Sequence, residues 1–304
     1  NREDWEMRRA EMLRMVEHYV SGPAFPQTQN AKLENLQSKN VFGGKATHHT
    51  ARVVMGPDHA IECAFEYVIP NADGPKPLLF YICPRSEYAE ETIPWRESII
   101  ERGYTFASVI PGQFNGYDNR GPVKDAFPNV KGNTMMAWVW GINEVIHYLD
   151  TTHKIENIVV TGTSRFGKTA ATVGALNERI GLTVPVTGGF GVRRFNAQDH
   201  KQPASAFAGR CWSNEVFPTF AGQLNRLPVD QHFVGALIAP RGLLAIMGDE
   251  NTHKNVGHIE AYEALVPVYE WLRAVDKLGI YDHAPRGHGI GEDDLFTVLD
   301  FADQ

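Results

Sequence analysis

The sequence lacks a long apolar run, an excess of positive charge and a cysteine cluster. No stretch approaches the roughly 18 consecutive apolar residues of a membrane-spanning helix, so we expect no membrane span. The formal net charge is −7, which leaves no basic field for phosphate contacts and argues against a nucleic-acid partner. Cys63, Cys83 and Cys211 lie far apart without metal-ligand spacing, so we predict free thiols and no metal site.

The remaining composition is typical of one large globular domain. The chain has 304 residues, 43% of them hydrophobic, and we expect a single domain over residues 1–304. Strand-length apolar runs alternate with helical patterns, which predicts an α/β fold with a mostly parallel twisted sheet and helices on both faces. The expected strands are 51–54, 60–69, 78–83, 105–110, 158–162, 183–187 and 243–248. The expected helices are 5–19, 93–102, 134–151, 168–178, 259–278 and 293–302.

The most informative segment is a strand followed by a serine turn and a helix. In IENIVVTGTSRFGK, the apolar residues 158–160 lead to Gly162, Ser164 and Gly167, and a helix is expected from Lys168. Such an elbow exposes the serine hydroxyl at a helix N-terminus, where the next backbone N–H can stabilise an oxyanion. The spacing GxSxxG differs from the commoner GxSxG, and serine is also a favoured helix N-cap. The segment alone does not decide whether Ser164 is a nucleophile or only the N-cap of the helix.

An acid and a histidine follow this serine in the chain order of the α/β-hydrolases. Asp249 and Glu250 come directly after the expected strand in LLAIMGDEN, where the acid that orients the base normally lies. His288 lies between two glycines in RGHGI, just before the last amphipathic helix. We therefore predict a serine hydrolase of the α/β-hydrolase fold, with Ser164 as nucleophile, His288 as base and one of the two acids as its partner. A solvated loop histidine is the alternative for His288.

Several segments resemble the glucuronoyl esterases, carbohydrate esterase family 15. They are TGTSRFGK at the serine, WVWGINEVIHYLD before it, LPVDQHFVGALIAPRGLLAI after it and RGHGI at the histidine. The resemblance extends from about residue 134 to the C-terminus and, more loosely, to the opening helix. The serine motif is specific in combination with PVDQH and LIAPR, whereas each segment alone would not be.

The resemblance implies roles for three further residues. Arg165 matches the arginine that faces the oxyanion, and Lys168 matches a lysine that contacts the hydroxyls of the uronate. An ester oxyanion and a polyhydroxylated acid both favour fixed cationic donors. The alternatives are a structural ion pair for Arg165 and a solvated first-turn lysine for Lys168. Glu215, in NEVF, matches more loosely a glutamate that hydrogen-bonds the sugar.

Some positions depart from the family's pattern. Thr163 and Gly289 stand where many members carry two bridged cysteines, so that disulfide is not expected here. Thr187 stands where many members carry the catalytic glutamate, about 23 residues after the serine. Other members use an acid after the penultimate strand, which makes Asp249 the first candidate and Glu250 its rival. The tryptophan that packs against the sugar in the family is not evident.

The resemblance also implies an activity. We expect hydrolysis of glucuronic acid esters in plant cell-wall xylan through an acyl-enzyme, with no metal or organic cofactor and a carbohydrate substrate as the partner. A polymeric substrate implies a secreted or periplasmic enzyme, although the opening segment shows no apolar signal-peptide region. Two alternatives remain, an esterase for acetylated xylan or another carbohydrate, and a catalytically silent relative that binds carbohydrate.

Overall fold

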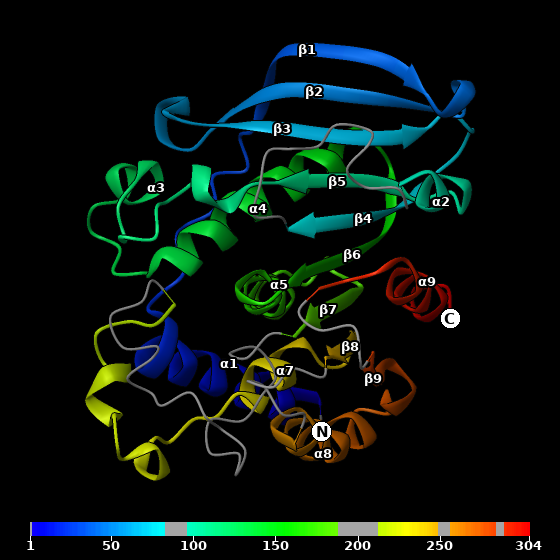
Figure 1. Ribbon diagram of the computed structural model, residues 1–304. Helices are drawn as coiled ribbons and strands as arrows, with labels where there is room; N and C mark the ends of the chain where they lie inside the picture. The colour runs from blue at the N-terminus through cyan, green and yellow to red at the C-terminus, as the bar shows by residue number, and fades with distance from the viewer. Residues whose placement is uncertain (1, 83–95, 188–211, 249–255, 284–288) are drawn as a thin grey trace.

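A mixed sheet with helices on both faces forms the centre of the molecule (Figure 1). The computed structural model describes residues 2–82, 96–187, 212–248, 256–283 and 289–304. The strands are β1 Lys32–Val41, β2 Ala46–Met55, β3 Ile61–Pro70, β4 Lys76–Ile82, β5 Thr105–Val109, β6 Ile155–Thr163, β7 Leu182–Val186, β8 Gly242–Met247 and β9 Leu278–Asp282. The helices are α1 Arg2–Val16, α2 Arg96–Glu101, α3 Pro122–Ala126, α4 Thr134–Thr152, α5 Arg165–Leu176, α7 His232–Ile238, α8 Val256–Trp271 and α9 Glu292–Ala302.

The strand order places the end of β6 in the middle of the sheet. The order is β1-β2-β3-β5-β4-β6-β7-β8-β9, in which β1, β2, β3 and β5 pair antiparallel and all pairs from β5 to β9 are parallel. The carboxyl ends of parallel strands share one edge of the sheet, and this edge is where open α/β sheets bind ligands. The segments that follow β6, β8 and β9 therefore leave the sheet on the same side.

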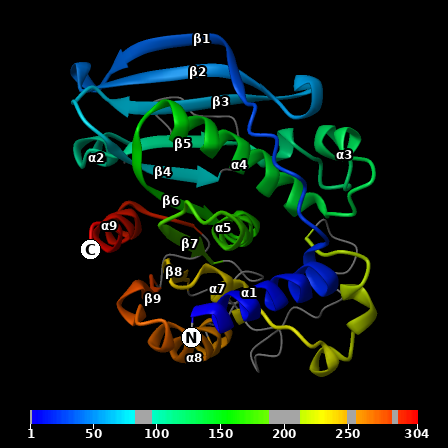
Figure 2. The same cartoon turned by 180° about the vertical axis from the view of Figure 1, so that it is seen from behind.

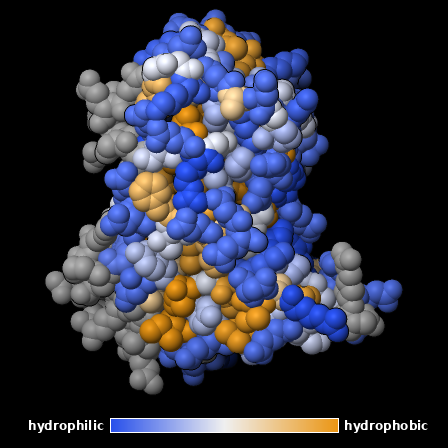
Figure 3. All heavy atoms as spheres, turned by 90° about the vertical axis from the view of Figure 1, so that its right-hand side faces the viewer, coloured by the Kyte–Doolittle hydropathy of each residue, from blue (hydrophilic) through white to orange (hydrophobic). Residues whose placement is uncertain are grey.

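Different helices cover the two faces of the sheet. On one face, α2 and α9 pack through Ile99, Leu295 and Val298 against β4, β5, β7 and β8. On the other face, α4, α5 and α7 lie against the sheet, with α1 and α8 alongside α7 (Figure 2). The surface on the side of α9 is largely hydrophilic, and apolar side chains gather at the end where α8 and β9 lie (Figure 3). None of the described helices is long and apolar enough to cross a membrane.

The expected α/β fold with a mostly parallel sheet is confirmed, and the errors fall on particular elements. The helix expected over 259–278 is wrong at its end, because α8 stops at Trp271 and the apolar residues from Leu278 form β9. The strand β1 and the short helices α3 and α7 were not predicted. The helix after the serine begins at Arg165, so Lys168 lies in its first turn and does not start it. The opening helix continues as a π-helix over Glu17–Ser21.

Arg241, from the LIAPR segment, fixes the far end of α5. Its guanidinium donates hydrogen bonds to the carbonyls of Asn177 and Ile180, at 3.0 and 3.1 Å, just beyond the end of this helix. Burial lowers the pKa of Arg241 to about 10, and the nearby charge of Arg9 adds to the shift, so the side chain remains protonated at neutral pH. A half-buried cation that binds carbonyls at a helix C-terminus also complements the helix dipole.

Candidate active site

Ser164 occupies the sharp turn between β6 and α5. Its backbone has φ 61° and ψ −120°, a conformation that non-glycine residues rarely adopt and that costs free energy where it is imposed. Ser164 stands at the N-cap position of α5, but its side chain makes no capping hydrogen bond, so the hydroxyl does not act as the cap that the alternative required. The Lys168 N–H donates the first backbone hydrogen bond of the helix, to the Ser164 carbonyl at 3.1 Å. The hydroxyl is therefore held at a strained turn and is not used by the helix.

Two glycines allow the chain to close this turn. A Cβ atom at Gly162 would lie 2.7 Å from the carbonyl oxygen of Phe166. A Cβ atom at Gly167 would lie 2.8 Å from the carbonyl oxygen of Val186 and 2.9 Å from that of Gly162. These atoms belong to the backbone and cannot rotate away. The spacing GxSxxG thus reflects close backbone packing. The start of α5 lies against the end of β6 and against the end of β7.

Three backbone hydrogen bonds connect the strand ends at this edge of the sheet. The Ser164 N–H donates to the Val186 carbonyl at 2.8 Å, which ties the nucleophile turn to the end of β7. The Thr187 N–H donates to the Ile246 carbonyl near the end of β8 at 2.8 Å, and the His283 N–H donates to the Met247 carbonyl at 3.0 Å. The segments after β6, β7, β8 and β9 therefore start from one continuous hydrogen-bonded edge.

The predicted acid and base belong to segments that start from this edge. Asp249 and Glu250 follow β8, and His288 follows β9, but all three lie outside the described residues. His283, directly after β9, has its Nδ1 3.1 Å from a carboxylate oxygen of Asp294, and both side chains are fully buried. The same oxygen of Asp294 accepts the N–H of Gly291 at 2.6 Å, which fixes the start of α9. This buried pair thus anchors the chain on both sides of residues 284–288.

Thr187 lies at the position where the family's glutamate was expected. It directly follows β7, has φ 45° and is only 4% exposed. No described group forms a hydrogen bond with its hydroxyl. A neutral hydroxyl has no charge with which to stabilise an imidazolium, so the structure offers no acid at this position.

Arg165 directs its guanidinium toward aromatic rings. Its Cζ lies 5.3 Å from the ring centre of Tyr117 and 5.9 Å from that of Phe166, within the range of cation–π attraction. Among the described residues, no carboxylate lies within ion-pair distance of this guanidinium. The side chain is half-buried beside the Ser164 turn. The ion-pair alternative thus finds no partner in the described part of the chain.

Lys168 is buried and faces a tryptophan. Its side chain is 5% exposed, which excludes the solvated alternative, and its Nζ lies 4.1 Å from the ring centre of Trp212. The sequence reasoning missed Trp212, and the only signal for it was its closeness to Glu215 in CWSNEVF. Glu215 itself is exposed, and no described contact joins it to Ser164, Arg165 or Lys168. An aromatic ring thus lies beside the lysine for which the resemblance implies contact with sugar hydroxyls.

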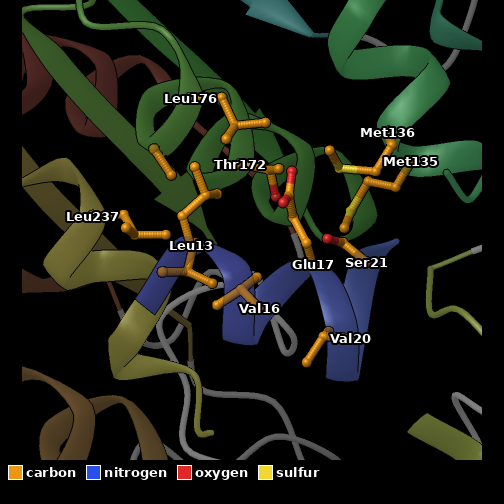
Figure 4. A pocket seen from close by; sticks show the side chains of 12 residues that line it. Leu13, Val16, Glu17, Val20, Ser21, Met135, Met136, Thr172, Leu176 and Leu237 are labelled. Atoms are coloured by element: carbon orange, nitrogen blue, oxygen red, sulfur yellow. The ribbon is translucent and has the colours of Figure 1, made fainter. Parts of the chain in front are cut away.

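A cavity next to α5 is too small to be the substrate site. It has a volume of about 20 Å³, enough for about one water molecule, and lies between α1, its π-helical extension, α4, α5 and α7 (Figure 4). Its walls are mostly apolar and include Leu13, Val20, Met136, Leu176 and Leu237. Sites for small organic ligands usually occupy about 300 Å³ or more. In the described part of the chain, no group of three His, Cys, Asp or Glu side chains could hold a metal ion.

Comparisons with known proteins point to one family. The family model described as "Glucuronyl esterase, fungi" matches residues 59–273. A 4-O-methyl-glucuronoyl methylesterase from Schizophyllum commune is 29% identical over 262 residues, which are 80% of this chain and 62% of that protein. The chain therefore spans less than two thirds of the length of this relative.

Solved structures agree with this match. A carbohydrate esterase family 15 glucuronoyl esterase from Caldicellulosiruptor kristjansonii superposes with a TM-score of 0.80 and 26% identity, over 99% of this chain and 85% of that chain. A serine-to-alanine mutant of a glucuronoyl esterase from Sporotrichum thermophile, in complex with methyl 4-O-methyl-β-D-glucopyranuronate, superposes with a TM-score of 0.77 and 21% identity, over 100% of this chain and 82% of that chain. At 21% identity, the likeness to this second structure concerns the fold alone.

Proposed function

Because this chain belongs to the glucuronoyl esterase family, carbohydrate esterase family 15, we propose that it hydrolyses carboxylic esters of glucuronic acid through an acyl-enzyme on Ser164. The observation that carries this proposal is the geometry of Ser164. Its hydroxyl is not used by the helix and projects from a strained strand-to-helix turn, at the sheet edge from which the segments of the predicted acid and base also start.

The proposed reaction follows the chemistry of a serine esterase. Ser164 Oγ attacks the ester carbonyl while His288 accepts its proton, and the tetrahedral oxyanion forms. His288 then returns the proton to the leaving alcohol, and the acyl group stays on Ser164. His288 next takes a proton from a water molecule that attacks the acyl carbon, and it returns this proton to Ser164 Oγ as the acyl bond breaks and the glucuronic acid leaves. The Arg165 guanidinium and backbone N–H stabilise the negative charge in both tetrahedral intermediates.

The partner of His288 is one of the two acids after β8. Asp249 is the first candidate, because the resemblance to the family's acidic loop places it at the acid, and Glu250 is the second. Only one of the two should face His288, since adjacent side chains at a strand end tend to point to opposite sides. The carboxylate would hold the imidazole in the tautomer whose Nε2 accepts the serine proton. We expect Asp249→Asn to lower kcat strongly with little change in thermal stability, and Glu250→Gln to have a mild effect. The reverse pattern would assign Glu250, and two mild effects would leave the imidazole without a carboxylate partner.

The sugar would lie on the side of Lys168. We propose that the Lys168 ammonium, beside Trp212, donates to hydroxyl groups of the uronate, and that Glu215 contributes a further polar contact.

Xylan of the plant cell wall is a polymer, so we propose that the protein acts outside the cytoplasm as a secreted or periplasmic enzyme.

A comparison of two substrates tests the proposed function. The wild-type enzyme is assayed with benzyl or methyl glucuronate and with an aryl acetate, and Ser164→Ala and His288→Ala are assayed beside it. We expect kcat/KM to favour the glucuronate ester strongly, and each variant to lose several orders of magnitude in kcat while it retains the wild-type melting temperature. Preference for the acetate would favour an acetyl esterase instead. Absence of turnover on both would mark a carbohydrate-binding relative.

A further inference from the structure

Tyr117 places an exposed aromatic ring against the arginine next to the nucleophile. Tyr117 is 52% exposed, although its ring packs against a buried neighbour. That neighbour is Trp138, which is fully buried and meets the Tyr117 ring edge-on at 5.4 Å and an interplanar angle of 83°. Trp138 also contacts Phe166 at 5.7 Å. Tyr117, Trp138 and Phe166 therefore form an aromatic cluster, and two of its rings lie within 6 Å of the Arg165 guanidinium.

The loop that carries Tyr117 is fixed on both sides of the ring. The carbonyl of Asn115 accepts the indole N–H of Trp138 at 2.8 Å, and the carbonyl of Gly116 accepts the Thr134 hydroxyl at 3.0 Å. The N–H of Gly116 in turn donates to the carbonyl of Arg120 at 2.7 Å, which closes the loop after the ring. The backbone of Tyr117 is thus held against the start of α4. The ring is a fixed surface, whereas an arginine side chain is long and flexible.

An aromatic partner leaves the positive charge of Arg165 without a counter-charge, which a carboxylate would supply. A carboxylate at ion-pair distance would largely offset the positive potential of the guanidinium and compete with a developing oxyanion for its donors. The face of an aromatic ring attracts the cation through its quadrupole and carries no net charge. The guanidinium is thereby ordered but its positive charge stays available to a substrate oxygen. This combination suits a group whose interaction is made only in the transition state.

We propose that Tyr117 is a positioning residue that holds the Arg165 guanidinium at the oxyanion position through its ring face. The inference rests on the proposed role of Arg165 in ester hydrolysis. The ring contributes little to folding because half of it is in solvent, so its main effect is on kcat. The phenolic hydroxyl is not required, because the attraction comes from the ring face and phenylalanine provides one as well.

A double-mutant cycle tests this proposal. Tyr117→Ala, Tyr117→Leu, Tyr117→Phe, Arg165→Ala and the Tyr117→Ala/Arg165→Ala double variant are compared by kcat and KM on whichever ester the wild type hydrolyses. We expect the alanine and leucine variants to lose about three- to tenfold in kcat with KM nearly unchanged, since a cation–π contact of this exposure has that weight. Tyr117→Phe should stay within about twofold of wild type. In the Arg165→Ala background, Tyr117→Ala should cost less than about twofold more.

A control variant and the outcomes that would contradict the proposal complete the test. Trp271→Ala removes a ring that is also 52% exposed but lies on α8 against Trp5, and it should leave kcat unchanged. An equal loss from Tyr117→Ala with and without Arg165, a loss confined to KM, or no rescue by Tyr117→Phe would each overturn the positioning role. A wild-type kcat in Arg165→Ala would instead refute the oxyanion assignment on which the inference rests.

Discussion

Gly167→Ala should damage both the stability and the activity of the enzyme, because of where the new methyl group would lie. It would be 2.8 Å from the carbonyl oxygen of Val186, and an ordinary contact begins near 3.4 Å. The start of α5 and the end of β7 must therefore separate by about 0.5 Å, since neither backbone can rotate away. The same carbonyl accepts the N–H of Ser164 at 2.8 Å, so the separation also displaces the nucleophile.

The expected magnitudes follow from this displacement. Overpacking of this kind costs about 1–3 kcal/mol, which for a chain of this length lowers the melting temperature by about 2–6 °C. Because a misplacement of about 1 Å can cost about a hundredfold in rate, a shift of half that size should lower kcat about tenfold. Thermal unfolding followed by circular dichroism and kcat on methyl glucuronate measure the two effects.

Gly112→Ala is the matched control for this substitution. A Cβ atom there would meet no heavy atom within 4 Å, and the residue is exposed, so both melting temperature and kcat should stay close to wild type. Wild-type stability of Gly167→Ala would refute the close packing of the elbow. A lowered melting temperature with unchanged kcat would show that the contact supports the fold but does not place Ser164.

Three other predictions concern single side chains. Lys168→Ala should lower kcat/KM on glucuronate esters and spare aryl acetates, whereas equal losses on both would mark the lysine as structural. Burial raises the pKa of the Cys63 thiol to about 12, so peptide mapping after iodoacetamide treatment at pH 8 should find Cys63 unmodified in the folded protein and modified in urea. Burial lowers the pKa of His153, so the unfolded chain binds a proton there more readily, and stability should fall as the pH drops from 7 to 5. A His153→Gln variant should lose less of its melting temperature over that interval, and an unchanged difference would contradict this cause.

The parts of the fold that could be predicted are those with a strong apolar signal. The buried parallel strands are near-continuous apolar runs, and each one was found within a few residues. The strand β1 was missed because nearly all of its side chains are exposed, so no alternation marks it. The boundary between α8 and β9 was missed because apolar residues continue across it. The chain turns at Arg273, which has φ 57°, and no glycine or proline at this turn indicates the end of the helix.

The site could be predicted where it depends on local backbone geometry. Gly162 and Gly167 indicate the tight elbow at Ser164, because close backbone approach excludes a side chain there. The contacts of Arg165 with Tyr117 and of Lys168 with Trp212 join segments far apart in the chain, so no local pattern could reveal them. Asp249, Glu250 and His288 stay predictions, as do the role of Glu215 and the single domain over residues 1–304.

Covalent labelling of Ser164 tests the central claim most directly. The wild type and Ser164→Ala are treated with a fluorophosphonate probe, and the labelled peptide is identified by mass spectrometry while hydrolysis of benzyl glucuronate is followed in the same samples. We expect one probe per chain on the peptide that contains Ser164, a loss of hydrolysis in proportion to labelling, and no label on the variant. Label on another residue, or full hydrolysis by the fully labelled enzyme, would contradict the assignment of Ser164 as the nucleophile of a glucuronate esterase.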